Sequence, residues 1–286
     1  MTKTTQSDSP NLTDLRRQID AIDDEIHAAL MRRAALVDGV ARAKRDTNAP
    51  GPGIRPGREA DIVRRLLARH EGPFPRRALV RIWREIVNAM TSLQGPYAVA
   101  VHVEDGAPAL WDMARDHFGS VVTLRDHDSS SAVIRAVLDQ PGTVGVLRFP
   151  EDSDPDPWWP QLAHSDPKAP RIIARLPFAT DGEPEVDACV IARSPLDGST
   201  ADRALFVLET AGPVSRASTL ERLAHAGFPA TILATLAGTT ADSGRLLLIE
   251  AEGRAASPTA QSLSAALGEA VVAVTPLGGY AVPVAL

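Results

Sequence analysis

Three cations share the apolar side of one predicted helix, which is an unusual place for charge. The stretch 12–45 carries Arg33 and Lys44 at helical spacing among its aliphatic residues, and Arg16 lies near its start. Burying an unpaired cation is costly, so such a side chain stays in solvent or finds an anion. We therefore expect these cations to hold a negatively charged ligand.

Two further polar positions fall on the next two predicted helices. Arg58 and Glu59 stand together at the start of one helix, and Gln94 closes the other. Taken singly, an Arg-Glu pair at a helix start is explained by the helix dipole, and a terminal Gln by solvation. Together with the cations they could line a small polar pocket with several positive charges, one carboxylate and one amide. Such a pocket suits a compact dianion that carries a hydroxyl group.

The elements that position these residues are three helices, predicted from apolar residues at three and four spacing over 12–45, 58–70 and 75–93. The loop 47–57, rich in Pro and Gly, separates the first two helices. The first helix would span on the order of 50 Å, which is more than a small domain needs internally. We expect it to pair with a second copy of the chain.

The composition is that of an ordinary globular protein, with 286 residues of which 44% are hydrophobic. The single cysteine, Cys189, excludes an internal disulfide and a multi-cysteine metal site. No run of eighteen apolar residues and no apolar leader is present, so we expect a cytoplasmic protein without membrane association. Residues 1–10 are predicted to form a disordered tail.

Charge is divided unevenly along the chain. Residues 1–95 hold 17 Lys and Arg against 12 Asp and Glu, and the remainder holds 13 against 24. A basic first third favours an anionic ligand there, although a scattered solvated surface would give the same asymmetry. Nucleic acid is not the expected anion, because no recognised binding module accompanies the arginines and the net charge is −6.

From residue 96 the sequence alternates between short β-rich runs and helical patterns. Residues 97–149 read as β-α-β-α-β, which predicts a small parallel layer. The segment 150–170 is a predicted loop in which Trp158 and Trp159 dock onto a neighbouring surface. The final 83 residues, after further strands near 171–194, read as β-α-β-β-α-β, the ferredoxin-like pattern.

Residues 11–94 resemble a known family. The runs LTDLRRQIDAIDDEI, RRAALVDGVARAK, RPGREADIVRRL and RIWREIVNAMTSLQ are closely similar, in register, to the all-helical class of chorismate mutases. The resemblance implies an intertwined dimer whose long first helices pair. It also implies the rearrangement of chorismate to prephenate, a reaction that uses no metal and no organic cofactor.

The same resemblance implies roles for four of the polar residues. Arg33 and Arg16 of the partner subunit would clasp the two carboxylates of chorismate. Lys44 would reach the ether oxygen and a carboxylate, and Gln94 would donate a hydrogen bond to the same ether oxygen. Each site of the dimer would thus be completed by the other chain.

The resemblance implies that Glu59 holds the ring hydroxyl and that Arg58 orients the loop and the substrate. Two positions depart from the pattern. Arg55 stands where some members have aspartate, and Met90 stands where some have serine. The first departure affects one expected contact with the substrate hydroxyl. The second departure affects one expected contact with a substrate carboxylate.

The remainder of the chain resembles a prephenate dehydratase followed by an ACT domain. GTVGVLRFPEDS at 142–153 and STADRALFVLE at 199–209 occupy the places of two dehydratase landmarks, and LGGY at 277–280 is an ACT-like ending. About 50 residues separate the two landmarks, too few for the usual second lobe. Ser153 and Arg203 are therefore favoured as surface or packing residues over catalytic ones, and the effector-binding motifs are absent.

The sequence and the resemblance together predict a multi-domain chain. Its expected parts are a tail at 1–10, an all-α three-helix mutase domain at 11–95, a degenerate prephenate dehydratase-like α/β segment at 96–200 and a ferredoxin-like, ACT-like domain at 201–286. The expected function is that of a dimeric chorismate mutase in phenylalanine and tyrosine biosynthesis, without dehydratase activity. Two alternatives stay open. One is a bifunctional mutase and dehydratase, and the other is a regulatory amino-acid-binding protein with a vestigial mutase pocket.

Overall fold

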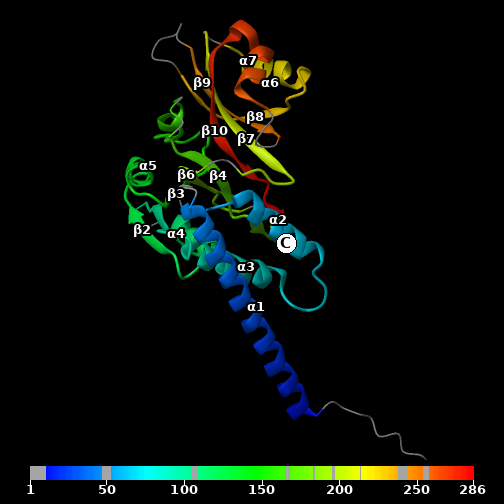
Figure 1. Ribbon diagram of the computed structural model, residues 1–286. Helices are drawn as coiled ribbons and strands as arrows, with labels where there is room; N and C mark the ends of the chain where they lie inside the picture. Colours follow the sequence, from blue (N-terminus) through cyan, green and yellow to red (C-terminus); the bar gives the residue numbers. More distant parts are fainter. Residues whose placement is uncertain are drawn as a thin grey trace, which may run out of the picture. The chain divides into compact units, whose positions relative to one another are not determined.

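The computed structural model describes residues 11–46, 53–104, 108–164, 166, 168–182, 184–194, 197–212, 214–237, 244–253 and 258–286, with side chains up to residue 42 in the first range. Its contacts divide the chain into two compact units, residues 1–50 and 51–286. Figure 1 shows the elements in order along the chain. The predicted tail at 1–10 lies outside the described residues.

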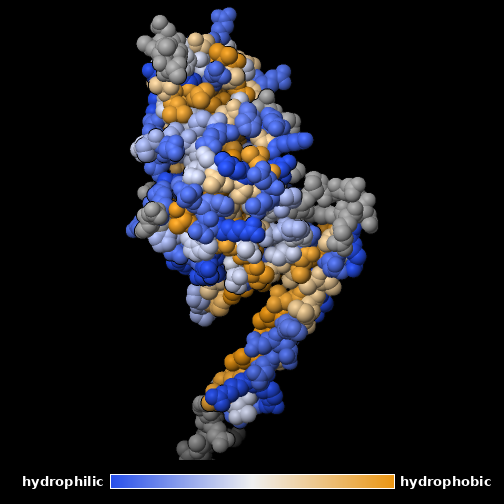
Figure 2. Space-filling view, turned by 90° about the vertical axis from the view of Figure 1, so that its left-hand side faces the viewer, coloured by the Kyte–Doolittle hydropathy of each residue, from blue (hydrophilic) through white to orange (hydrophobic). Residues whose placement is uncertain are grey.

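The first unit contains one long helix, α1 (Leu12–Asp46, 35 residues). Asn11 caps it, because its side-chain oxygen accepts a hydrogen bond from the Thr13 N–H at 3.0 Å. The aliphatic residues on the apolar side of α1, which we call its apolar seam, are exposed in the single chain. Figure 2 shows hydrophobic residues along the length of the helix. Ile19, Ile22 and Ile26 are 57%, 55% and 54% exposed. An amphipathic helix with its apolar side open leaves a large hydrophobic face without cover.

The second unit begins with two shorter helices, α2 (Pro56–Ala68) and α3 (Arg76–Ser92). Pro56 opens α2 because its fixed φ suits the first helical position. The two helices agree with the predicted ones to within about two residues. Their buried aliphatic residues pack with Phe178 and Ala281, which come from the α/β part of the same unit.

A parallel layer follows, as the alternating pattern predicted. Strand β1 lies between β2 and β3 and is parallel to both. Ser129 caps the second of its two helices through a hydrogen bond from the Ala132 N–H. The elements of this layer are β1 (Ala98–His102), α4 (Ala109–Phe118), β2 (Thr123–His127), α5 (Ser130–Asp139) and β3 (Thr143–Arg148).

The next segment extends this layer with antiparallel strands. Strand β6 pairs with both β3 and β4. Trp158 and Trp159 are 2% and 0% exposed in the core, which confirms that they dock inward. The elements are η1 (Trp159–Leu162), β4 (Arg171–Leu176), β5 (Ala179–Thr180) and β6 (Ala188–Ala192).

The C-terminal elements follow the predicted β-α-β-β-α-β order. Their strands lie in the order β10-β7-β9-β8 and all neighbours are antiparallel, which is the ferredoxin-like arrangement. The elements are β7 (Asp202–Thr210), α6 (Arg216–His225), β8 (Ala230–Leu236), β9 (Leu246–Glu252), α7 (Ala260–Leu267), η2 (Gly268–Ala270), β10 (Val271–Ala281) and β11 (Val284–Ala285).

The two α/β parts share one nine-stranded mixed sheet in the described part of the chain, in the order β2-β1-β3-β6-β4-β10-β7-β9-β8. They meet where β4 runs parallel to β10, with Gly278 opposite Ile172. A Cβ atom at Gly278, whose φ is +127°, would lie 2.1 Å from the Ile172 carbonyl oxygen. Only glycine permits this approach of the two backbones. The segments 96–200 and 201–286, which the sequence separates, are thus joined by main-chain pairing.

Candidate active site

The cations of the first unit lie far apart along α1. Arg16 is exposed near the N-terminus and Arg33 is half-buried near the middle. Seventeen residues of helix separate them, which corresponds to roughly 25 Å along the axis. One small dianion cannot contact both residues of the same helix. Lys44 lies in the last turns of α1, and its side chain is outside the described residues.

In the second unit the structure places a buried partner beside Glu59. Arg84 of α3 donates from Nη1 to Glu59 Oε2 at 3.0 Å, and the two side chains are 7% and 14% exposed. A charge-assisted hydrogen bond between nearly buried groups fixes the orientation of both. Arg84 is therefore a positioning residue for the carboxylate that opens α2.

Arg84 belongs to a polar cluster of α3 and its surroundings. The Asn88 amide donates to the carbonyl oxygens of Arg84 and His117, each at 2.9 Å, and accepts from the Tyr97 hydroxyl at 3.0 Å. Burial lowers the pKa of Arg84, although the charge of Glu59 opposes this. Burial and the charge of Arg84 hold the pKa of His117 well below 6.5, so its imidazole is neutral at pH 7.

The other face of Arg84 lies against an aromatic ring. Its guanidinium carbon is 4.9 Å from the centroid of Phe178, and that of Arg64 on α2 is 5.7 Å from the same ring. Such cation–π contacts are stronger when the cation is desolvated. An aromatic residue of the α/β part thus supports one arginine from each of the two helices.

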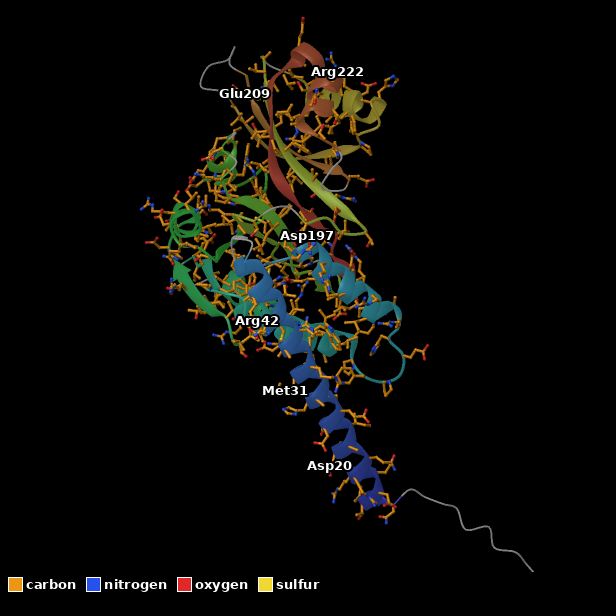
Figure 3. All side chains as sticks on the ribbon, viewed as in Figure 1. Asp20, Met31, Arg42, Asp197, Glu209 and Arg222 are labelled. Atoms are coloured by element: carbon orange, nitrogen blue, oxygen red, sulfur yellow. The ribbon has the colours of Figure 1, made fainter. Side chains whose placement is uncertain are left out.

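Arg58 is exposed, and its backbone rather than its side chain is fixed. The Arg58 N–H donates to Asp197 Oδ2 at 3.0 Å, and Arg55 Nη2 donates to Oδ1 at 2.8 Å. Asp197, which Figure 3 labels, lies in a loop about 140 residues later in the sequence. Its carboxylate accepts hydrogen bonds at the N-terminal end of α2, where the backbone N–H groups have no partner within the helix. Gly57 allows this approach, because a Cβ there would lie 2.3 Å from the Asp197 carbonyl oxygen.

The same loop is fastened to the middle of α2. Arg64 donates to Ser199 Oγ at 2.9 Å and to the carbonyl oxygens of Ala201 and Val282 at 3.1 and 2.7 Å. Asp61 accepts from the Thr200 N–H and hydroxyl at 3.1 and 2.8 Å. The first two turns of α2, which carry Arg58 and Glu59, are thus anchored on the α/β part.

Gln94 lies just beyond α3 and is half-buried. Its Nε2 is 3.4 Å from the Met90 carbonyl oxygen, which is a weak hydrogen bond. Met90 is buried and faces inward as an apolar residue. The structure brings Glu59 to Arg84 and Arg58 to Asp197, two partners that the sequence analysis did not single out.

The two dehydratase-like landmarks carry their own ion pairs. Asp152 pairs with Arg216 and accepts from the Thr235 N–H at 2.8 Å, next to Ser153. Arg203 pairs with Glu252 at 3.0 Å. These contacts join the first landmark to α6 and β8, and the second to β9.

The described part of the chain contains no group of three His, Cys, Asp or Glu side chains that could hold a metal ion. No helix among the described elements is long and apolar enough to cross a membrane.

Residues 15–95 match the family described as chorismate mutase type II. The chain is 28% identical over 144 residues to a bifunctional chorismate mutase/prephenate dehydratase of Pseudomonas aeruginosa, covering 49% of this chain and 39% of that protein. It is 39% identical over 94 residues to the bifunctional chorismate mutase/prephenate dehydratase of Aquifex aeolicus, covering 31% and 25%. The chain therefore spans at most about two fifths of the length of these relatives.

A solved structure described as "GqqA, a novel type of quorum quenching acylases" has a similar fold. The TM-score is 0.50 at 16% identity, with 65% of this chain and 96% of that chain covered. At this identity the similarity concerns the fold alone.

Proposed function

Residues 15–95 form a chorismate mutase type II domain, the domain of an isomerase, and from this premise we propose that the chain rearranges chorismate to prephenate within a homodimer. One observation carries the proposal: the matched residues contain the six polar groups to which the resemblance gives roles in the reaction. These groups are Arg16, Arg33, Lys44, Arg58, Glu59 and Gln94.

The rearrangement is intramolecular, so catalysis rests on orientation and on electrostatics. Two arginines that clasp the carboxylates would hold the enolpyruvyl arm over the ring in a reactive conformer. Lys44 and Gln94 would donate hydrogen bonds to the ether oxygen, on which negative charge develops. A single preorganised donor of this kind contributes roughly 3 kcal/mol, or about 100-fold in rate. No cofactor takes part.

Glu59 would hold the ring hydroxyl, and the structure supports this role through Arg84. A carboxylate that is already oriented loses little freedom when it binds the substrate. The contact with Asp197 fixes the backbone of Arg58 at the start of α2. These contacts link the α/β part of the chain to the proposed mutase site.

The proposed dimer rests on α1 and α3. Arg16 lies too far along the helix to reach a substrate held by Arg33 of its own chain, so Arg16 of the partner subunit would complete each site. The open apolar seam of α1 offers the surface for pairing. Ile82 of α3 and Leu93, which directly follows α3, are 45% and 57% exposed and offer further apolar area to a partner helix.

The C-terminal part is proposed to be a degenerate dehydratase-like region with an ACT-like end. The engagement of Arg203 in a salt bridge supports the loss of dehydratase activity, and the ferredoxin-like strand order supports the ACT-like assignment. A bifunctional enzyme is the second candidate, favoured by the names of the relatives. It would release phenylpyruvate from prephenate at neutral pH.

The deciding experiment mixes Arg16→Ala and Lys44→Ala chains under conditions that exchange subunits. Each pure variant should lose about 100-fold or more of the chorismate turnover that absorbance follows. Half of the dimers in an equal mixture are hybrids with one intact site, so about a quarter of the wild-type activity should return. Arg17→Ala, an exposed neighbour of Arg16, is the matched control and should retain activity. No turnover by the wild-type protein would refute the mutase proposal.

A further inference from the structure

The helices α2 and α3 belong to the same compact unit as the α/β elements, although the match to the mutase family ends at residue 95. Their cluster of apolar residues includes four from the α/β part, namely Phe178, Ala281, Val284 and Leu286. Val63 of α2, which is 3% exposed, belongs to this cluster. The two helices therefore share a hydrophobic core with the α/β part.

The helix α2 begins without a capping side chain of its own. Its N-cap residue, Arg55, makes no side-chain hydrogen bond to the helix, and Pro56 has no N–H to donate. A capping side chain accepts a hydrogen bond from the N–H of the second or third helical residue. Arg58 is the third residue of α2, and its N–H donates to Asp197 Oδ2 at 3.0 Å. Asp197 therefore caps α2 from a position 139 residues later in the sequence.

One side of α2 contacts the loop that carries this cap. Gly57, Asp61 and Arg64 follow one another at spacings of four and three residues, and each lies against residues 197–201. At Gly57 the approach is so close that a Cβ atom would lie 2.3 Å from the Asp197 carbonyl oxygen. Contacts at three positions over two turns fix the rotation of the helix and its position along its axis.

The helix α3 is fastened to the end of α4. Both carboxylate oxygens of Glu85 accept from the Ser120 N–H, at 3.0 and 2.9 Å. The Asn88 amide donates to the His117 carbonyl oxygen at 2.9 Å. Gly119, with a φ of +76°, leaves room for the Glu85 carboxylate, because a Cβ atom there would lie 2.1 Å from it. Polar contacts thus tie both helices to the α/β part.

We propose that the α/β part is the scaffold of the proposed mutase site, and that Asp197 is a positioning residue for Arg58 and Glu59. The inference rests on the proposed mutase function. Both residues lie in the first turn of α2, so loss of the cap would displace both. A displacement of about 1 Å can lower a rate about 100-fold. The α/β part thereby has a role that requires no dehydratase activity.

The kinetic test compares Asp197→Ala with Asp197→Asn in the intact chain. An asparagine oxygen still caps a helix, whereas alanine does not. We expect kcat/KM for chorismate to fall at least about tenfold in Asp197→Ala and less than about threefold in Asp197→Asn. Asp139→Ala removes an exposed carboxylate at the end of α5 and is the matched control, which should have wild-type kinetics.

A second measurement reports the cap independently of the reaction. Selective ¹⁵N labelling of arginine allows NMR to follow the exchange of the Arg58 N–H with solvent. This exchange should be at least about tenfold faster in Asp197→Ala and within about threefold of the wild-type rate in Asp197→Asn.

Gly57→Ala displaces the loop without removing the carboxylate. Alanine favours a helix, but its Cβ atom would collide with the Asp197 carbonyl oxygen. The exchange of Arg58 and kcat/KM should therefore change in the same direction as in Asp197→Ala. Gly182→Ala is the control, because no atom lies within 4 Å of the added Cβ atom.

Three outcomes would overturn the inference. Wild-type kinetics in Asp197→Ala, together with faster exchange at Arg58, would show that the cap does not position the site. An equal loss of kcat/KM in Asp197→Asn and Asp197→Ala would show that charge rather than capping matters. Unchanged exchange at Arg58 in Asp197→Ala would remove the cap itself. If the wild-type chain does not turn over chorismate, the proposed function fails, and the exchange measurement still decides whether Asp197 holds α2.

Discussion

Arg84 Nη1 lies 3.0 Å from Glu59 Oε2, so a buried residue of α3 holds the carboxylate that opens α2. The contact has two consequences. It orients a group proposed to bind the substrate hydroxyl, and it places a charge pair where either partner alone would be costly. The stability of the protein and the proposed role of Glu59 therefore both depend on it.

Removal of Arg84 should destabilise the protein strongly. Arg84→Met removes the guanidinium that contacts the nearly buried Glu59 carboxylate, and we expect the free energy of unfolding to fall by about 3–5 kcal/mol. Arg81→Gln, which breaks the exposed pair with Asp116, should cost under about 1 kcal/mol. Urea unfolding measures both. Equal effects of the two variants would show that the Arg84–Glu59 pair is not buried in solution.

Glu59→Gln tests the role of the carboxylate in catalysis. A hydrogen bond from the substrate hydroxyl to a charged group contributes about 1.5–3 kcal/mol, so kcat/KM for chorismate should fall about 10- to 100-fold. Glu71→Gln, in the exposed turn between α2 and α3, is the control and should have full activity. Unchanged kinetics in Glu59→Gln would remove this residue from the site.

Arg64 should contribute more stability than its neighbour. Arg64→Met removes the guanidinium donor of the part-buried Val282 carbonyl oxygen, whereas the Ala201 carbonyl oxygen still accepts from the Val282 N–H and the Ser199 hydroxyl. We expect a loss of about 1–3 kcal/mol in guanidinium chloride unfolding. Arg65→Met, at an exposed position, should change stability by less than about 0.5 kcal/mol.

His117 should make the protein less stable as the pH falls below 6.5. Its pKa in the folded chain lies well below 6.5, so between these values the unfolded chain binds the proton and the folded chain does not. The free energy of unfolding should therefore decrease with falling pH, by no more than about 1.4 kcal/mol per unit. Urea midpoints at pH 7.5, 6.5 and 5.5 measure the slope. His117→Gln should flatten it, whereas His27→Gln, an exposed site on α1, should not.

Cys189 should be inert while the protein is folded. The side chain is fully buried in β6, and burial raises the pKa of its thiol, so the reactive thiolate is scarce. Ellman's reagent should react at least about 100-fold more slowly with the folded protein than in denaturant. The Cys189→Ala variant gives the blank. Rapid reaction of the native protein would show that β6 opens easily.

Local signals were sufficient to predict most of the elements. The apolar periodicity of α1 continues from Leu12 through Gly39 to the Pro-rich loop, and the helix ends within one residue of the predicted position. The alternation of strands and helices predicted the parallel layer around β1, because each signal depends on neighbouring residues only. Both polar pairs at the start of α2, by contrast, depend on residues distant in sequence.

Arg84 shows why part of the site could not be predicted. In RIWREI it reads as a solvated residue, and its burial depends on Phe178, 94 residues later. The sequence did carry one signal: Arg84, Asn88 and Thr91 are spaced by four and three residues and form a buried polar stripe. Ile82 and Leu93, which belong to the apolar periodicity of the third helix, are both exposed in the single chain.

The pairing of β4 with β10 at Gly278 affects how the protein can be cut into fragments for expression. A gene fragment that ends near residue 200 would lack β10 and would leave the edge of β4 with unpaired N–H and C=O groups. A fragment that begins there would expose the matching edge of β10. Each fragment would then have an exposed strand edge with unpaired backbone groups. The two fragments should therefore aggregate when they are expressed separately, and the yield of soluble protein should be highest when they are expressed together.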